Sequence, residues 1–278
     1  MSMKLSIDPV LKVFIKRAYL ENYERNFYNV MTLVTGVVVL IFVFSLLLLP
    51  SNDLNIPSNS ALYSRILYET YGIFLPPSKA VVVLTLIPII IFLPSLFTLI
   101  LSSSIPYYFL YNLRMNSEIE IFLSYLGGPK RVFSIIMKAS LIFTLFYYMI
   151  YYGVTTVLIL LFIPVLLSSI QFLILFYIGG LVIILLTLLL VIILSLKFPS
   201  LSKPSTSFGR SVPPSLSIAS LVSVAEYVLF EIINAMFVSY SQITTLLIIG
   251  FNSSIVLILA VLFMKFRGSV TAEDFISR

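Results

Sequence analysis

The sequence predicts an all-α polytopic membrane protein with six transmembrane helices. Of its 278 residues, 60% are hydrophobic and only 10% are charged, and the mean hydropathy is +1.12. Uncharged apolar runs recur along the chain, and runs of about 18 or more such residues are typical of helices that span a lipid bilayer. A soluble protein of this size could not bury so much apolar surface. We therefore expect one transmembrane domain over residues 1–278.

Residues 1–28 are expected to form an interfacial helix that leads into the first span. Asp8 can cap a helix and Pro9 suits its first position. Over residues 7–18 the apolar and the basic side chains fall on different faces, as in helices that lie in the membrane surface. The first long apolar run begins near residue 29, behind this charged segment, and is too long for the core of a cleavable signal peptide.

Six apolar segments are each expected to cross the membrane, since each is near or above the roughly 20 residues that a bilayer requires. They cover residues 29–49, 79–113, 132–163, 166–196, 216–239 and 244–266. A Ser- and Pro-rich linker at residues 197–215 separates the first four from the last two. The outer loop at residues 50–78 is expected to hold a short helix around residues 61–74, and a tight hairpin is expected at residues 164–169.

The basic residues indicate the orientation of these spans. Fifteen of the 17 Lys and Arg residues fall on one side of the predicted membrane, and only Arg65 and Lys79 fall on the other. Because cytoplasmic loops are enriched in basic residues, both termini, including a tail at residues 267–278, are expected in the cytoplasm. The predicted location is the cell (plasma) membrane. The net charge of +6 then reflects topology, and we expect no nucleic-acid partner.

Between the second and third spans, residues 117–131 predict a short helix with its own start and stop. Ser117 can cap the helix, and Glu120 three residues later completes a capping box. Gly127, Gly128 and Pro129 are typical of the end of a helix. Two basic residues follow directly, as expected at the cytoplasmic face. A helix with such local signals, under the membrane, is predicted to dock a cytosolic partner.

One side of this short helix is apolar. The stripe follows the i, i+3, i+4, i+7 spacing of a helix face and consists of Ile119, Phe122, Leu123 and Leu126. We expect Phe122 and Leu123 to anchor in a groove of the partner, and Glu118 and Glu120 to meet basic groups at its rim. Alternatively, the segment is an ordinary interfacial helix whose apolar stripe lies on lipid.

Nothing in the sequence predicts catalysis by this chain alone. The chain has no Cys and no His, which removes thiolate ligands, the commonest general base and the usual Ser-His arrangement. No G-x-x-x-x-G-K-[ST] phosphate-binding loop is present, and the carboxylates show no metal-ligand spacing. We therefore expect no catalytic residues, no metal site, no cofactor and no nucleotide hydrolysis by this chain alone.

Two acidic residues fall inside the fifth predicted span. Glu226 would lie ~15 Å deep at 1.5 Å per residue, where an ionised carboxylate is costly and needs a cavity or a partner. Glu226, Glu231 and the nearby Asn234 could therefore line a translocation path. Alternatively, the acids pack inside the bundle against polar neighbours. This interpretation is favoured because Glu226 and Glu231 are five residues apart and thus ~140° apart around a helix, not on one face.

Together these elements resemble the membrane subunit of an ABC exporter of the type-2 permease class. The shared architecture is an elbow helix entering the first span at residues 14–33, six spans with both termini inside, and a coupling helix between spans two and three. Glu118, Glu120, Leu123, Pro129 and Lys138 stand where that class has its acidic coupling segment and the lysine that follows it. The connection at about residues 240–243 is a departure, because the class usually has re-entrant outer helices there.

The resemblance implies a cytosolic ATP-binding subunit and a second membrane subunit, either another copy of this chain or a homologous permease. The contact to the ATP-binding subunit would be made by Glu118, Glu120, Phe122, Leu123, Leu126, Gly127, Gly128, Pro129 and Lys130. Closure of that subunit upon ATP binding would be transmitted through residues 117–131. Nothing in the spans indicates the transported substrate.

Two further interpretations remain open. The stretch at residues 118–136 also resembles the cell-division and lipoprotein-release permeases, although these have large outer domains and typically four spans, whereas the largest outer loop here covers residues 50–78. From a different functional class, the chain could be a non-transporting membrane platform or channel protein. Such a protein would anchor a cytosolic ATPase for secretion, filament assembly or DNA transfer.

Overall fold

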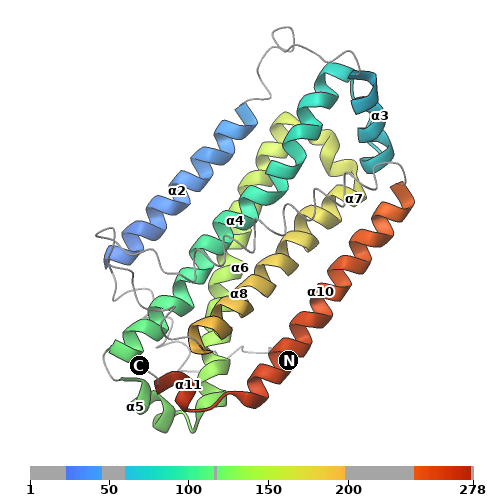
Figure 1. Cartoon of the computed structure of the whole chain (residues 1–278). Helices are drawn as coiled ribbons and strands as arrows, with labels where there is room; N and C mark the ends of the chain where they lie inside the picture. The colour runs from blue at the N-terminus through green and yellow to red at the C-terminus, as the bar shows by residue number, and fades with distance from the viewer. Residues whose placement is uncertain (1–22, 46–59, 116–117, 198–240, 277–278) are drawn as a thin grey trace, which may run out of the picture.

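The computed structural model describes residues 23–45, 60–115, 118–197 and 241–276, and all regular structure in these ranges is helical. The all-α class is therefore confirmed for this part of the chain (Figure 1). In chain order the elements are α2 (Tyr23–Ser45), α3 (Ser60–Tyr71), α4 (Pro77–Met115), α5 (Glu118–Tyr125), α6 (Pro129–Phe162), the 3₁₀-helix η2 (Pro164–Ser168), α7 (Ile170–Leu173), the π-helix η3 (Ile174–Gly179), α8 (Gly180–Lys197), α10 (Ser241–Ser269) and α11 (Glu273–Ile276).

Three described segments are long and apolar enough to cross a membrane, which supports a membrane protein. They are Pro77–Ser102, Pro129–Phe162 and Ile170–Lys197, and they lie in the second, third and fourth predicted spans. The first predicted span contains a shorter apolar helix, Val30–Ser45, and α10 covers the sixth. The predicted fifth span at residues 216–239 lies outside the described residues, as do residues 1–22 of the predicted interfacial helix and residues 198–215 of the linker.

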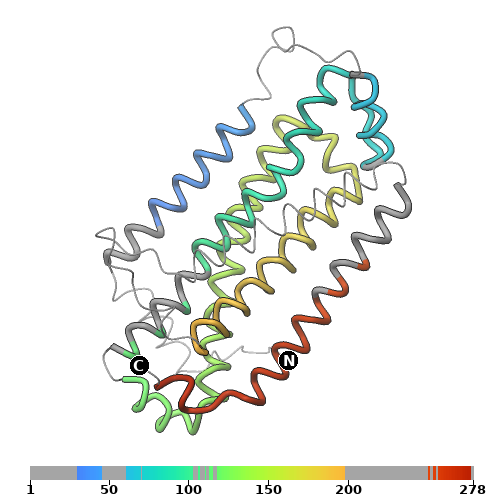
Figure 2. Tube along the Cα trace, in the orientation of Figure 1, coloured from blue at the N-terminus to red at the C-terminus, as the bar shows by residue number. Residues whose placement is uncertain are grey.

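The long helices run side by side, with short helices at both ends (Figure 2). α4 packs against both α6 and α8, α2 packs against α4 and α6, and α10 packs against α8. At one end α3 contacts α4, α7 and α10, and at the opposite end α11 contacts α4, α5 and α8. Basic side chains gather at the α5 end, from Arg114, Lys130, Arg131, Lys197, Lys265 and Arg267, whereas Arg65 and Lys79 belong to the α3 end.

The predicted outer-loop helix and hairpin both have counterparts in the structure. Helix α3 covers most of residues 61–74, and the Ser64 hydroxyl donates to the Leu75 carbonyl at 2.6 Å, which fixes the chain after the helix. The hairpin at residues 164–169 is the 3₁₀-helix η2, begun by Pro164. The segment predicted as one span over residues 166–196 is interrupted, because η2, α7 and the π-helix η3 precede α8.

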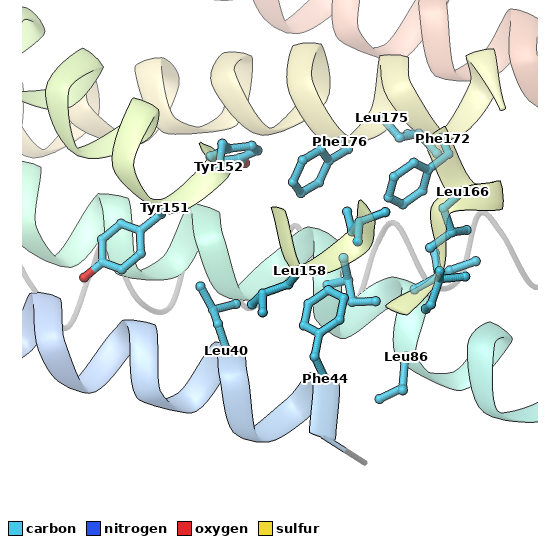
Figure 3. Packing of buried hydrophobic residues seen from close by; sticks show 14 of the residues in the cluster. Leu40, Phe44, Leu86, Tyr151, Tyr152, Leu158, Leu166, Phe172, Leu175 and Phe176 are labelled. Atoms are coloured by element: carbon cyan, nitrogen blue, oxygen red, sulfur yellow. The ribbon is translucent and has the colours of Figure 1, made fainter. Parts of the chain in front are cut away.

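Aromatic and branched side chains form the larger core, between α2, α4, α6 and the α7–α8 segment (Figure 3). Tyr151, Tyr152 and Phe172 are almost completely buried. The rings of Phe172 and Phe176 stack at 5.5 Å, and that of Tyr152 lies 4.7 Å from Phe176. These side chains fill the space between α6 and the irregular start of the fourth predicted span, where offset and tilted ring pairs pack well.

Three buried threonine hydroxyl groups in this bundle bond within their own helices. Thr98, Thr144 and Thr155 each donate to the carbonyl four residues earlier, at 2.7, 2.7 and 2.8 Å. Such bonds satisfy polar side chains where neither water nor another helix supplies a partner. The Tyr148 hydroxyl instead donates to the Tyr177 carbonyl in η3 at 2.9 Å. Because a π-helix departs from the regular α-helical bonding pattern, this bond stabilises the local irregularity.

Candidate partner-binding site

The short helix predicted at residues 117–131 is present as α5, and its end follows the predicted signals. The Gly128 amide donates to the Leu123 carbonyl at 3.0 Å and the Gly127 amide to the Ser124 carbonyl at 3.4 Å. This pair of bonds is the Schellman arrangement, which requires a left-handed residue after the helix, and Gly127 has φ +75°. Pro129 then begins α6. The predicted cap, Ser117, lies outside the described residues.

The apolar stripe of α5 faces the chain's own helices. Ile119, Leu123 and Leu126 are only 3%, 9% and 2% exposed, and Phe122 packs beside them half-buried. They belong to a second core, here called the α5-end cluster, which combines side chains of α4, α5, α6, α8, α10 and the α11 segment. Its members are Leu110, Leu113, Ile119, Leu123, Leu126, Val132, Phe133, Ile135, Ile136, Met137, Ala139, Leu188, Leu189, Ile192, Leu196, Phe266, Val270 and Phe275.

Leu123 lies inside this cluster and Phe122 lies half-buried against it, and the expected contact of these two residues with a partner stays a prediction. For Leu123 such a contact would require the side chain to leave the cluster. The stripe was predicted correctly as an apolar face, but the surface that covers it belongs to the same chain. The wider prediction, that residues 117–131 contact an ATP-binding subunit, stays a prediction.

The opposite face of α5 is open. Ile121 and Tyr125 are 66% and 79% exposed, and Glu120, Ser124 and Lys130 are exposed with them. We call Glu120, Ile121, Ser124 and Tyr125 the outer face of α5. On this face, Ile121 and Tyr125 lie beside the Glu120 carboxylate, and the basic residues Lys130 and Arg131 follow shortly after the helix. Aromatic and aliphatic anchors with a charged rim are the usual composition of a protein-binding surface.

A guanidinium group joins the helix ends behind α5. Arg114, near the end of α4, donates from Nε to the Phe275 carbonyl at 3.1 Å and from Nη1 to the Ser195 carbonyl at 3.1 Å. Its Nη2 donates to the Asp274 carbonyl at 2.9 Å and, at 3.5 Å, to that of Leu196. These carbonyls lie at the end of α8 and in α11. Carbonyl groups at a helix end have no partner within the helix, and here one side chain donates to them. Burial lowers the pKa of Arg114, although an arginine stays charged at neutral pH.

An ion pair and two hydrogen bonds from Thr271 hold α11 at the same place. Lys197 Nζ lies 2.7 Å from Asp274 Oδ1, while Asp274 Oδ2 accepts from the Thr271 amide at 2.9 Å and its hydroxyl at 3.2 Å. Burial opposes ionisation of Asp274, but the hydrogen bonds from Lys197 and Thr271 outweigh it and lower the pKa of the carboxyl group. The predicted tail thus contains a helix that sequence reasoning missed. The signal was present, because Thr271 and Asp274 have the spacing of a capping box before an aromatic residue.

The acidic residues proposed for a translocation path are not placed by the structure. Glu226, Glu231 and Asn234 lie outside the described residues. Within the described ranges, no group of three or more His, Cys, Asp or Glu side chains is placed to hold a metal ion.

Comparison with protein-family models, with curated proteins and with solved structures gave no match to this chain.

Proposed function

We propose that this chain is the permease subunit of an ATP-driven ABC-type exporter, and that it works as a pair with a second permease and with separate ATP-binding subunits. In this proposal the α5 end faces the cytoplasm, both termini lie on that side, and six spans cross the plasma membrane. Residues 117–131 receive the movement of the ATP-binding subunit. Glu226, Glu231 and Asn234 are the proposed polar residues of the path.

One observation carries the proposal: α5 is bound to the membrane helices on one face and exposed on the other. Its inner face packs into the α5-end cluster, while Ile121 and Tyr125 project from the outer face with exposures of 66% and 79%. A helix that only connected two spans along the lipid surface would be expected to turn its apolar stripe to lipid. Here the stripe is buried internally, so large apolar side chains on the outer face are available for a partner.

The arrangement also offers a route for force. α5 contacts both α4 and α6, and only the turn at Gly127 and Gly128 separates it from α6. A push on the outer face would therefore reach two long apolar helices directly. The proposed contact differs from the sequence-based one in its residues: Ile121 and Tyr125 are the anchors, Glu120 and Lys130 form the charged rim, and Phe122 and Leu123 support α5 from inside.

Partner binding by outer-face variants tests the proposal. Tyr125→Ser combined with Ile121→Ser should weaken binding of a co-expressed ATPase carrying a P-loop and an ABC signature at least tenfold, since interface anchors often contribute more than about 1.4 kcal/mol. Leu62→Ser with Tyr68→Ser is the matched control, because these α3 residues are 51% and 59% exposed at the opposite end of the bundle.

The control variant should bind the ATPase like the parent chain. Unchanged binding by the outer-face variant, at normal membrane levels, would contradict docking through α5. Recovery of a hexameric motor ATPase in place of an ABC subunit would instead favour the platform or channel interpretation.

A further inference from the structure

The chain segment after α10 returns to the back of α5. Val270, 3% exposed, and Phe275, fully buried, are part of the same apolar cluster as Ile119, Leu123 and Leu126. α11 contacts α4, α5 and α8 at this place. The residues that support α5 from inside therefore include side chains from the far end of the described sequence, and not only those of its neighbours α4 and α6.

The end of α10 is attached to the same cluster by its aromatic residues. The Phe266 ring lies edge-on against that of Phe133 with centroids 5.2 Å apart, and Phe133 is in the first turns of α6. Lys197 Nζ lies 5.7 Å from the centroid of the Phe266 ring. Lys197 thus contacts α10 through its cation and α11 through Asp274, which ties the end of α8 to both.

Polar bonds fix the position of α11 against two long helices. Arg114 of α4 donates to carbonyls in α11 and at the end of α8, and Lys197 of α8 forms its ion pair with Asp274 of α11. Guanidinium geometry suits this role, because several donors lie in one rigid plane and reach several acceptors at once. A small displacement of α8 or α10 relative to α4 would therefore shift α11, and α11 contacts α5.

We propose that residues 266–276 are a strap that sets the position of α5 according to the positions of α8 and α10, with Arg114 as its positioning residue. Phe275 is the apolar anchor of the strap beneath α5, and the ion pair between Lys197 and Asp274 holds the strap against the end of α8. The consequence for coupling rests on the proposed function, whereas the structural link between the strap and α5 does not.

Arg114 could instead serve only as a cap for α8, and the two roles predict different results. A cap matters to the end of α8 alone, so a variant lacking it would leave α5 unaffected. A strap holds α5, so loss of either Arg114 or Phe275 would loosen α5. Phe275 separates the two roles clearly. Its ring packs in the cluster, and its side chain makes no hydrogen bond that could cap α8.

Hydrogen exchange of the α5 amides in the full chain tests the strap. Phe275→Ala and Arg114→Lys should each accelerate exchange in α5 at least about tenfold, which corresponds to about 1.4 kcal/mol. The first variant loses a buried aromatic ring, and in the second a lysine cannot replace the guanidinium bonds to several carbonyl groups at once. The controls are Phe74→Ala and Arg131→Lys, which alter the same residue types at exposed positions. They should change α5 exchange less than twofold.

Unchanged exchange in α5 with both strap variants would overturn the proposal, provided that the centre of α6 remains protected and the chain is folded. If Phe275→Ala alone abolishes folding, Arg114→Lys and Asp274→Asn decide by the same criterion. Hydrogen exchange is measured without a partner, so a negative result would not contradict docking through the outer face. Equally, loss of the docking proposal would not contradict the strap.

A kinetic measurement separates positioning from general stability. In the complex with the ATP-binding subunit, Arg114→Lys should lower the transport-coupled maximal rate of ATP hydrolysis severalfold without changing the KM for ATP, since the nucleotide site is in the other subunit. A change in KM with an unchanged maximal rate would contradict a positioning role for Arg114.

Discussion

Truncation of Leu123 to Ala distinguishes an internal support of α5 from a partner anchor. The side chain is 9% exposed and lies in a cluster with residues of α4, α6 and α11. Replacing a buried Leu by Ala costs about 2–5 kcal/mol. α5 has eight residues, and Ile119, Leu123 and Leu126 are buried in it or beside it. Because the other two residues still hold the helix when Leu123 is truncated, we expect a local loss of stability of about 2–3 kcal/mol, at the lower end of that range.

The matched variant is Ile121→Ala, on the outer face of the same helix. Ile121 is 66% exposed, and exposed substitutions usually change stability by less than about 0.5 kcal/mol. Both truncations remove apolar atoms within one turn of the same helix, so a difference between them reports the face and not the helix propensity.

Hydrogen exchange in the absence of any partner is the appropriate assay, since it measures local opening residue by residue. A loss of about 2–3 kcal/mol corresponds to α5 amides that exchange about 30 to 150 times faster in the Leu123→Ala variant. The Ile121→Ala variant should exchange nearly as the parent does. Equal exchange in both variants, or faster exchange only with Ile121→Ala, would refute the assignment of the two faces.

Two other predictions follow from contacts away from α5. A Cβ atom at Gly180 would lie 1.8 Å from the Tyr152 hydroxyl oxygen, so Gly180→Ala should lower thermal stability in detergent, and adding Tyr152→Phe should recover part of the loss; no recovery would place the strain elsewhere. The lowered pKa of Asp274 means that its ion pair with Lys197 stabilises the fold fully above the unfolded-state value of about 4 and loses this effect as the pH falls through the lower folded-state value. Docking of α11, monitored by a spin label, should therefore stay constant from pH 5 to 8, and Asp274→Asn should loosen it at pH 7; loosening between pH 8 and 5 would contradict this assignment.

Local signals in the sequence were sufficient for the elements that depend on neighbouring residues. The end of α5 follows from Gly127, Gly128 and Pro129, because a left-handed glycine and a helix-starting proline act within a few bonds. The long apolar helices α4 and α6 follow from length and composition in the same way. Pro57 and Pro76, on either side of the segment, likewise indicate the helix in the outer loop.

Tertiary contacts decide the features that could not be predicted. The apolar spacing of Ile119 and Leu123 identifies a face, but the same spacing suits lipid, a partner or the chain itself, and here the surface beneath it includes Phe275. Arg114 binds carbonyl groups 160 and 161 residues later, a distance in sequence that no periodicity reveals. A carbonyl group of the π-helix η3 similarly accepts a bond from Tyr148 on another helix.

Site-specific photo-crosslinking from position 125 in native membranes tests the proposed function most directly. Tyr125 on the outer face is 79% exposed, against 66% for Ile121, and a photoreactive phenylalanine there keeps its aromatic shape. We predict a covalent adduct with a protein that carries a P-loop and the ABC signature, identified by mass spectrometry, and none with that protein when the same group replaces Tyr68 on α3. Adducts with lipid alone at position 125, or with a hexameric motor ATPase, would contradict an exporter subunit that docks its ATPase through α5.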